Sequence, residues 1–133
     1  MSALQDLASV FKALADPTRL RILRLLLEAR VELCVCELVD CLEEPQYNIS
    51  KHVNALKAAG LLKSRRDGRW VYYQPVVTNE QFFSTLTQAI SSIPSKQLRR
   101  DRREFDKRLR LREGGKCLRG IQKEHLLEKA AVR

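Results

Sequence analysis

The sequence has few of the residues from which most catalytic centres are built. Its two histidines, His52 and His125, lie far apart along the chain. No nucleophile elbow, phosphate-binding glycine loop or cluster of carboxylates accompanies them, and the adjacent acids Glu43 and Glu44 are typical of a solvated turn. The sequence therefore does not indicate an enzyme.

Long hydrophobic runs are also absent. The longest apolar stretch, LRLLL, is far too short to cross a bilayer, and the first residues contain Asp6 and lack the basic start of a secretory signal. Aromatic residues make up only 6% of the chain, without the spread of aromatics that single-strand nucleic-acid binders use as a stacking platform. We expect a cytoplasmic protein with no membrane partner.

Positive charge is concentrated near the C-terminus. The 133 residues carry a formal net charge of +9, of which residues 1–93 contribute +1 and residues 94–133 contribute +8. A basic protein favours polyanionic partners such as nucleic acid. We expect a domain over 1–93 and a basic tail over 94–133, partly helical or flexible, that is loosely held or ordered only against a partner.

The apolar pattern of residues 1–93 predicts a mainly α fold with one hairpin. Helical spacing recurs over residues 3–14, 17–29, 35–42, 46–59 and 79–93. Two strand-prone runs flank Asp67-Gly68, which is a strong hairpin signal. Two short helices joined by a tight turn and followed by a hairpin form a winged helix-turn-helix.

Local signals support two of these helix boundaries. Asp16 suits the N-cap of the second helix, with Pro17 at its first position. Gly60 suits the stop of the fourth helix. These boundaries place residues 46–59 as a separate helix directly after the turn at Glu43 and Glu44.

Cys34 and Cys36 lie one residue apart in the segment ELCVCEL. Without an exported context, thiols are kept reduced, which leaves thiolate chemistry or simple packing. Thiolates select soft, thiophilic ions. Side chains two residues apart on a helix point about 200° apart. We therefore expect that an ion held by both sulfurs must unwind the first turn of the helix over 35–42.

Four segments in this order resemble the ArsR/SmtB family of repressors: ALADPTRLRIL, ELCVCEL, NISKHVNALKAAGLL and RRDGRWVYYQ. The resemblance spans about residues 5–92 and looks closest to the branch that responds to arsenite and antimonite. It implies a homodimer formed through the first and fifth helices. It also implies a transcriptional repressor that binds double-stranded operator DNA of an arsenic-resistance operon and dissociates when As(III) or Sb(III) is bound as inducer, with no permanent cofactor.

The resemblance assigns Cys34 and Cys36 as metal ligands but leaves the third ligand open. The arsenical branch usually has a further cysteine at the position of Val39. The alternatives are Cys41, which needs most of the short helix to unravel, Cys117 from the same chain or its partner, and an outside thiol.

Other metals fit the resemblance less well. Cadmium and lead sensors of the family carry extra cysteines on an N-terminal arm, and residues 1–33 contain none. Zinc, nickel and cobalt sensors place histidine and acids on the last dimer helix, and residues 79–93 offer only Glu80. Both absences favour As(III) and Sb(III).

The predicted DNA-binding residues lie on the fourth helix and the hairpin. Polar and cationic side chains near the start of a recognition helix suit base edges and phosphates, and cations on the wing suit phosphates. For His52 the resemblance implies either DNA contact or helix packing. The candidates are Gln46, Tyr47, Asn48, Ser50, Lys51, His52, Arg65, Arg66 and Arg69.

Two other functions remain open at this point. The thiols could form a redox or persulfide switch on the same fold, although a pair at this spacing is awkward for a disulfide. The protein could also bind nucleic acid constitutively through its basic tail.

Overall fold

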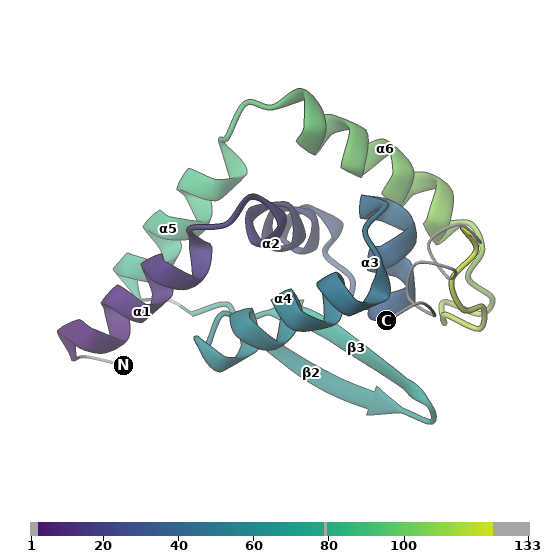
Figure 1. Cartoon of the computed structure of the whole chain (residues 1–133), viewed down its shortest axis with the longest axis horizontal. Coiled ribbons are helices and arrows are strands. Elements are labelled where there is room, and N and C mark those ends of the chain that lie inside the picture. The colour runs from purple at the N-terminus through teal and green to yellow at the C-terminus, as the bar shows by residue number, and fades with distance from the viewer. Residues whose placement is uncertain (1–2, 79, 124–133) are drawn as a thin grey trace.

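The computed structural model describes residues 3–78 and 80–123, and it shows a winged-helix domain extended by a further helix (Figure 1). None of the described helices is long and apolar enough to cross a membrane. The helices are α1 (Leu4–Leu14), α2 (Pro17–Ala29), α3 (Val35–Leu42), α4 (Gln46–Ala58), α5 (Gln81–Ser91) and α6 (Lys96–Leu109). The strands are β1 (Leu33–Cys34), β2 (Leu62–Asp67) and β3 (Trp70–Pro75).

The boundary signals of the sequence are confirmed. The side chain of Asp16 caps α2 by accepting hydrogen bonds from the N–H groups of Thr18 at 2.8 Å and Arg19 at 3.1 Å, and Pro17 is the first residue of that helix. Gly60 after α4 has a φ of 80°, and Gly68 in the hairpin turn has a φ of 63°. These left-handed conformations favour glycine, so they fix the turns that lead into and through the wing.

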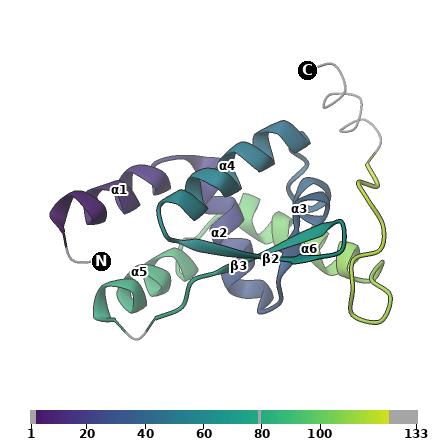
Figure 2. The ribbon, with the colours of Figure 1, turned by 90° about the horizontal axis from the view of Figure 1, so that it is seen from below.

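A small antiparallel sheet with the strand order β1-β3-β2 forms the wing and its base. The hairpin between β2 and β3 was predicted, whereas β1 was not. β1 pairs with β3 through Leu33 opposite Tyr73 and Cys34 opposite Tyr72. This pairing holds Cys34 in an extended conformation directly before α3. The two longer strands, β2 and β3, lie side by side (Figure 2).

The core lies between α1, α2, α3 and α4. Val10, Ile22, Leu38, Ile49 and Leu56 have no exposed surface and belong to one continuous apolar cluster. Burying each such side chain contributes about 1.5–3 kcal/mol. The recognition helix α4 is therefore seated on α2 and α3 through a shared core.

Residues 96–123 pack against this domain, and the prediction of a loosely held tail is wrong for them. α6 lies on α3 and α2 (Figure 1) and buries Leu98, Asp101, Phe105 and Arg108. Its buried face mixes charged and apolar residues. The buried carboxylate of Asp101 is stabilised because it accepts hydrogen bonds from Arg21 at 2.9 Å. The predicted division at Pro94 stays a prediction, and residues 124–133 lie outside the described part of the chain.

Candidate functional site

Three cysteines meet at the N-terminus of α3. The Sγ atoms of Cys34 and Cys36 lie 2.8 Å apart, those of Cys34 and Cys117 3.1 Å, and those of Cys36 and Cys117 3.4 Å. Within the described residues, this is the cluster whose side chains could hold a metal ion. We call Cys34, Cys36 and Cys117 the thiol cluster.

The thiol cluster forms without any unwinding of α3, so that expectation is wrong. Cys34 is the N-cap of α3, with φ −86° and ψ 166°, so of the pair Cys34 and Cys36 only Cys36 lies within the helix. The calculation of about 200° applies to two residues in one regular helix. Because β1 extends the chain at Cys34, its side chain turns toward Cys36 instead of away from it.

Cys117 joins the cluster because the chain after α6 folds back over α3. Its N–H donates to the hydroxyl of Tyr72 at 3.0 Å, and its side chain is fully buried. Cys41, the other candidate for a third ligand, is also fully buried but belongs to the main core. The geometry therefore brings Cys117, and not Cys41, to the pair.

Buried ion pairs tie the returning segment to α3. Arg108 donates to Asp40 at 2.7 Å, with both side chains less than 5% exposed. Arg112 donates to Glu37 at 2.7 and 2.8 Å. Arg108 also donates to the carbonyl oxygen of Arg119 at 2.8 Å, which fixes the backbone two residues after Cys117.

The surroundings of Cys34 and Cys117 favour the protonated state of these two thiols. The hydrogen bond with Cys36 and burial raise the pKa of Cys34 far above its ordinary value. Burial and the hydrogen bond with Cys34 raise the pKa of Cys117 to about 11. A cation also lies beside the cluster, because Nη2 of Arg108 is 3.9 Å from the sulfurs of both Cys36 and Cys117.

Glu37 lies at the junction of the thiol cluster and α3. Burial acts to raise the pKa of Glu37, but hydrogen bonds from Arg112 and from the N–H of Cys34 outweigh it and lower the pKa. The Glu37 carboxylate therefore stays ionised and accepts from Cys34 at both its N–H (3.1 Å) and its thiol (3.4 Å). This places a fixed negative charge beside the sulfur of Cys34.

The predicted DNA-binding residues of α4 lie at different depths. Gln46, Tyr47 and Lys51 are exposed, whereas Asn48 and Ser50 are half-buried. His52 is only 7% exposed, and its Nδ1 accepts a hydrogen bond from Arg19 at 3.1 Å. Burial lowers the pKa of His52. Of its two predicted roles, this position supports helix packing.

The predicted cations of the wing are exposed, and all three have contacts within the protein. Arg66 donates to the carbonyl oxygen of Gly68 at 3.5 Å. Arg65 donates to Glu32 at 2.5 and 2.9 Å and lies over the ring of Tyr72. Arg69 stacks on Trp70. Tyr72 therefore contacts a wing cation on one side and bonds the backbone of Cys117 through its hydroxyl.

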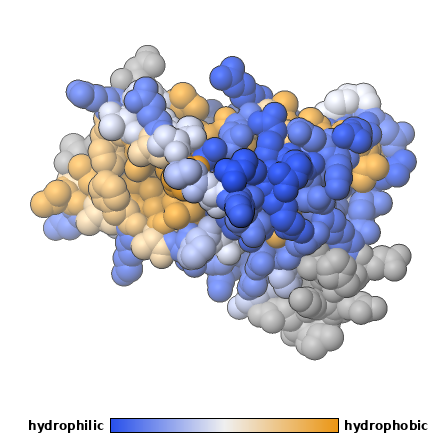
Figure 3. All heavy atoms as spheres, turned by 90° about the horizontal axis from the view of Figure 1, so that it is seen from above, coloured by the Kyte–Doolittle hydropathy of each residue, from blue (hydrophilic) through white to orange (hydrophobic). Residues whose placement is uncertain are grey.

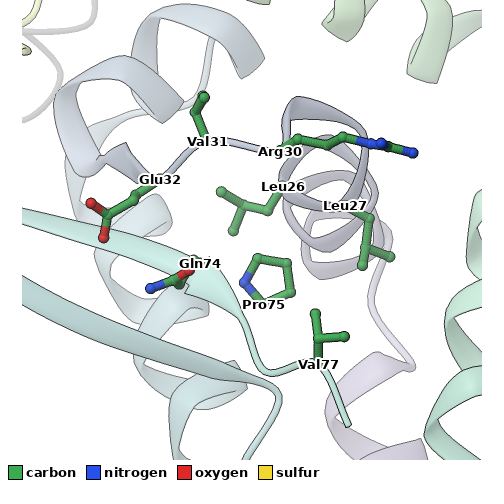
Figure 4. A pocket seen from close by; sticks show the side chains of 8 residues that line it. All are labelled: Leu26, Leu27, Arg30, Val31, Glu32, Gln74, Pro75 and Val77. Carbon is green, nitrogen blue, oxygen red and sulfur yellow. The ribbon is translucent and has the colours of Figure 1, made fainter. Parts of the chain in front are cut away.

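A hollow of about 460 Å³ lies away from the thiol cluster, between the end of α2, the following loop and the end of β3 (Figure 4). Apolar side chains dominate it, and it contains no cysteine or histidine. This hollow therefore does not form part of the thiol cluster. Its lining residues are Leu26, Leu27, Arg30, Val31, Glu32, Gln74, Pro75 and Val77.

Sequence reasoning missed the residues that support the thiol cluster. The sequence predicts Tyr72 only as part of the second strand-prone run of the hairpin, and Arg108 and Arg112 only as part of the basic tail. The available signal was the spacing of Leu98, Asp101, Phe105 and Arg108, which lie on one helix face.

A winged-helix fold with an exposed polar recognition helix, joined through a shared core to a cluster of thiols, defines a DNA-binding regulator of transcription. Residues 16–64 match the family model described as bacterial regulatory protein, arsR family. The chain belongs to this family of DNA-binding transcriptional repressors, which are not enzymes.

The relatives and solved structures agree with this family. The chain is 48% identical over 73 residues to the uncharacterized HTH-type transcriptional regulator MJ1325 of Methanocaldococcus jannaschii, covering 55% of this chain and 81% of the relative. It is 54% identical over 65 residues to the arsenic resistance transcriptional regulator ArsR1 of Pseudomonas putida, covering 49% of this chain and only 50% of the relative. Reduced HlyU from Vibrio cholerae superposes with a TM-score of 0.55 at 30% identity, covering 67% of this chain and 92% of HlyU.

Proposed function

We propose that this repressor responds to As(III) or Sb(III), binds operator DNA as a homodimer, and leaves the DNA when Cys34, Cys36 and Cys117 bind the metalloid. The observation that carries the proposal is the thiol cluster, with all three sulfurs within 3.4 Å of one another. Three sulfurs without a nitrogen ligand form a soft donor set, which thiophilic ions prefer.

Binding at the thiol cluster would move the start of α3. Sulfurs held by one ion at about 2.3 Å, the usual zinc–sulfur bond length, lie roughly 3.3–3.8 Å apart. An ion at this distance sets the positions of all three sulfurs, so it draws Cys34 at the start of α3 and Cys117 after α6 into one fixed geometry and shifts the first turn of α3. Because α3 packs on α4, this shift changes the seat of the recognition helix. Coupling of this kind is typically about 1–3 kcal/mol.

The DNA-binding role rests on the exposed start of α4 and on the wing. Gln46 and Lys51 offer an amide and a cation to base edges and phosphates. Arg66 and Arg69 offer phosphate contacts from the hairpin. His52 supports α4 from inside the fold and is left out of the contacts that we propose.

An apolar face supports the homodimer. Leu4 is 81% exposed and Phe11 is 56% exposed on α1, and Phe11 packs edge-to-face on Phe82 of α5 with ring centroids 5.7 Å apart. Figure 3 shows this apolar area over α1 and α5. Exposed apolar patches of this kind mark interfaces. We expect Phe11→Glu to give a monomer in light scattering and to weaken operator binding.

The two alternative functions receive less support from the geometry. A redox sensor needs a thiolate of low pKa, whereas the pKa values of Cys34 and Cys117 are raised. Constitutive binding through the tail leaves the thiol cluster and the recognition helix without a role.

The deciding experiment is a titration of the full chain against duplex DNA selected for tight binding, with and without arsenite. Arsenite is expected to weaken binding by about 5–150-fold, and Cys34→Ser and Cys36→Ser are expected to keep the DNA affinity while losing this response. Cd(II) is titrated in parallel to test the choice of ion. Duplex binding that is equally strong with arsenite present would contradict the proposed inducer. Failure to select any specific duplex would contradict the repressor itself.

A further inference from the structure

Cations line up along the solvent-facing side of α6. Lys96, Arg99, Arg103, Lys107 and Arg110 are all exposed, and at about 100° per residue they fall within an arc of about 80°. The buried residues of α6 lie on the opposite side of the helix. We call these five cations the α6 stripe.

Most of the α6 stripe has no partner within the described residues. Lys107 pairs with Glu104 at 3.2 Å, whereas Lys96, Arg99, Arg103 and Arg110 form no side-chain hydrogen bond or ion pair with any described residue. The acids of α6 are engaged elsewhere. Asp101 bonds Arg21, Glu104 bonds Lys107 and Lys123, and Asp106 bonds Arg102. Within the described residues, the charges of four of the five stripe residues are therefore left uncompensated.

A hollow lined by four arginines adjoins the stripe. It has a volume of about 240 Å³ and lies between α2 and α6. Arg24 and Arg102 in its wall pair with Glu28, while Arg99 and Arg103 in the same wall remain unpaired. Figure 3 shows the surrounding face as a continuous hydrophilic area.

The α6 stripe lies on the other side of the molecule from the recognition helix. α2 and α3 lie between α6 and α4 (Figure 1), and α6 packs on α2 and α3. Duplex DNA has a persistence length of about 50 nm, so a straight duplex lying on α4 does not reach α6. Anything bound by the stripe is therefore a separate molecule or a distant part of the same one.

We propose that the α6 stripe binds the phosphate backbone of a second DNA duplex, without sequence preference, while α4 and the wing hold the first. The stripe is about 21 Å long, a length over which duplex DNA presents about 12 phosphates. A single small anion fills only a fraction of it. Membrane-surface helices insert an apolar face, but Leu98 and Phe105 of α6 are already buried in the protein.

The test measures capture of one duplex by protein already bound to another. Full chain is loaded on an immobilised duplex selected for tight binding, without arsenite, and a labelled duplex of unrelated sequence is added at 50 mM salt. Arg99→Gln/Arg103→Gln is compared with Lys12→Gln/Arg30→Gln, which removes the same charge from exposed residues outside α6. We expect the first variant to lose about tenfold or more in capture and to reduce the salt slope by about 2, and the second variant to match wild type.

Four results would overturn the proposal. The first is no capture by wild type, and the second is equal capture by both variants. The third is weaker binding to the immobilised duplex by Arg99→Gln/Arg103→Gln but not by the control variant, which would show that the stripe contacts the first duplex. Vesicles containing an anionic lipid are tested in parallel, and stripe-dependent binding to them without duplex capture would also overturn the proposal. Because arsenite is omitted, the outcome is independent of the proposed inducer.

Discussion

α4 and α6 both pack against α3, and they are held to it in different ways. α4 rests on α3 through apolar side chains such as Ile49, Leu38 and Leu56, and apolar contact has no preferred direction. α6 and the segment after it add directed, buried ion pairs to the apolar packing of Phe105, and Arg108 with Asp40 is the most buried of these pairs.

This difference indicates which parts move together. Charge-assisted hydrogen bonds fix distance and angle, so the ion pairs hold α6 and the segment that carries Cys117 in a fixed position on α3. The apolar contact with α4 tolerates a small shift at lower cost. A change at Cys34 is therefore expected to appear as a movement of α4 relative to α3, and the following predictions test this contrast.

The largest expected effect separates Cys117 from Cys41, the two cysteines considered as the third ligand. Cys117→Ala removes a sulfur from the thiol cluster and is expected to weaken arsenite binding by about 10²–10⁴-fold, since the third attachment is intramolecular. The matched variant Cys41→Ala removes a sulfur from the core and is expected to leave arsenite affinity unchanged. The fluorescence of Trp70, the only tryptophan and a neighbour of the thiol cluster, reports binding. Equal losses in both variants would contradict the assignment of Cys117.

The next effect concerns the ion pair that binds α6 to α3. Arg108→Met leaves Asp40 buried with only backbone donors, from Gln122 and Lys123, and is expected to lower the free energy of unfolding by about 3–5 kcal/mol. The exposed control Arg103→Met is expected to stay within about 0.5 kcal/mol of wild type. Urea denaturation measures both, and adding Asp40→Asn to Arg108→Met should recover part of the loss. A loss no larger than that of the control would show that α6 is only loosely bound.

The parts of the fold that depend on local residues could be predicted from the sequence, whereas the parts that depend on distant residues could not. The start of α2, the end of α4 and the wing depend on neighbouring residues, namely Asp16, Gly60 and Gly68, so the local pattern was sufficient. The thiol cluster needs Cys117, 81 residues after Cys36, and the two-residue strand that extends Cys34. Neither a long-range return of the chain nor a strand of two residues leaves a periodic signal, and buried arginines in α6 resemble solvated ones until their acidic partners are known.

The pH dependence of binding sharpens the choice of ion. Neutral arsenite exchanges three hydroxyl groups for three thiols and releases water, so its affinity is expected to be nearly constant from pH 6 to 8. Cd(II) must displace the protons of Cys34 and Cys117, whose pKa values are raised, to about 11 for Cys117. Its affinity is therefore expected to rise by about 100-fold for each pH unit when two protons are released. Titrations followed by Trp70 fluorescence check both, and an arsenite affinity that rises as steeply would contradict binding by protonated thiols.

The smallest expected effect lies on the DNA side. Arg65 is held by Glu32, and an exposed pair of this kind competes only weakly with a phosphate. Glu32→Gln frees Arg65 and is expected to strengthen duplex binding by less than about fivefold, whereas Glu80→Gln, which removes the same charge from an exposed residue outside the wing, should change it less. Fluorescence anisotropy at low salt measures the difference. Arg112, which supports the thiol cluster, contacts Glu32 through the backbone carbonyl oxygen and not through the side chain. Arsenite affinity should therefore stay constant in both variants. A change in arsenite affinity with Glu32→Gln would instead show that the wing and the thiol cluster move as one body.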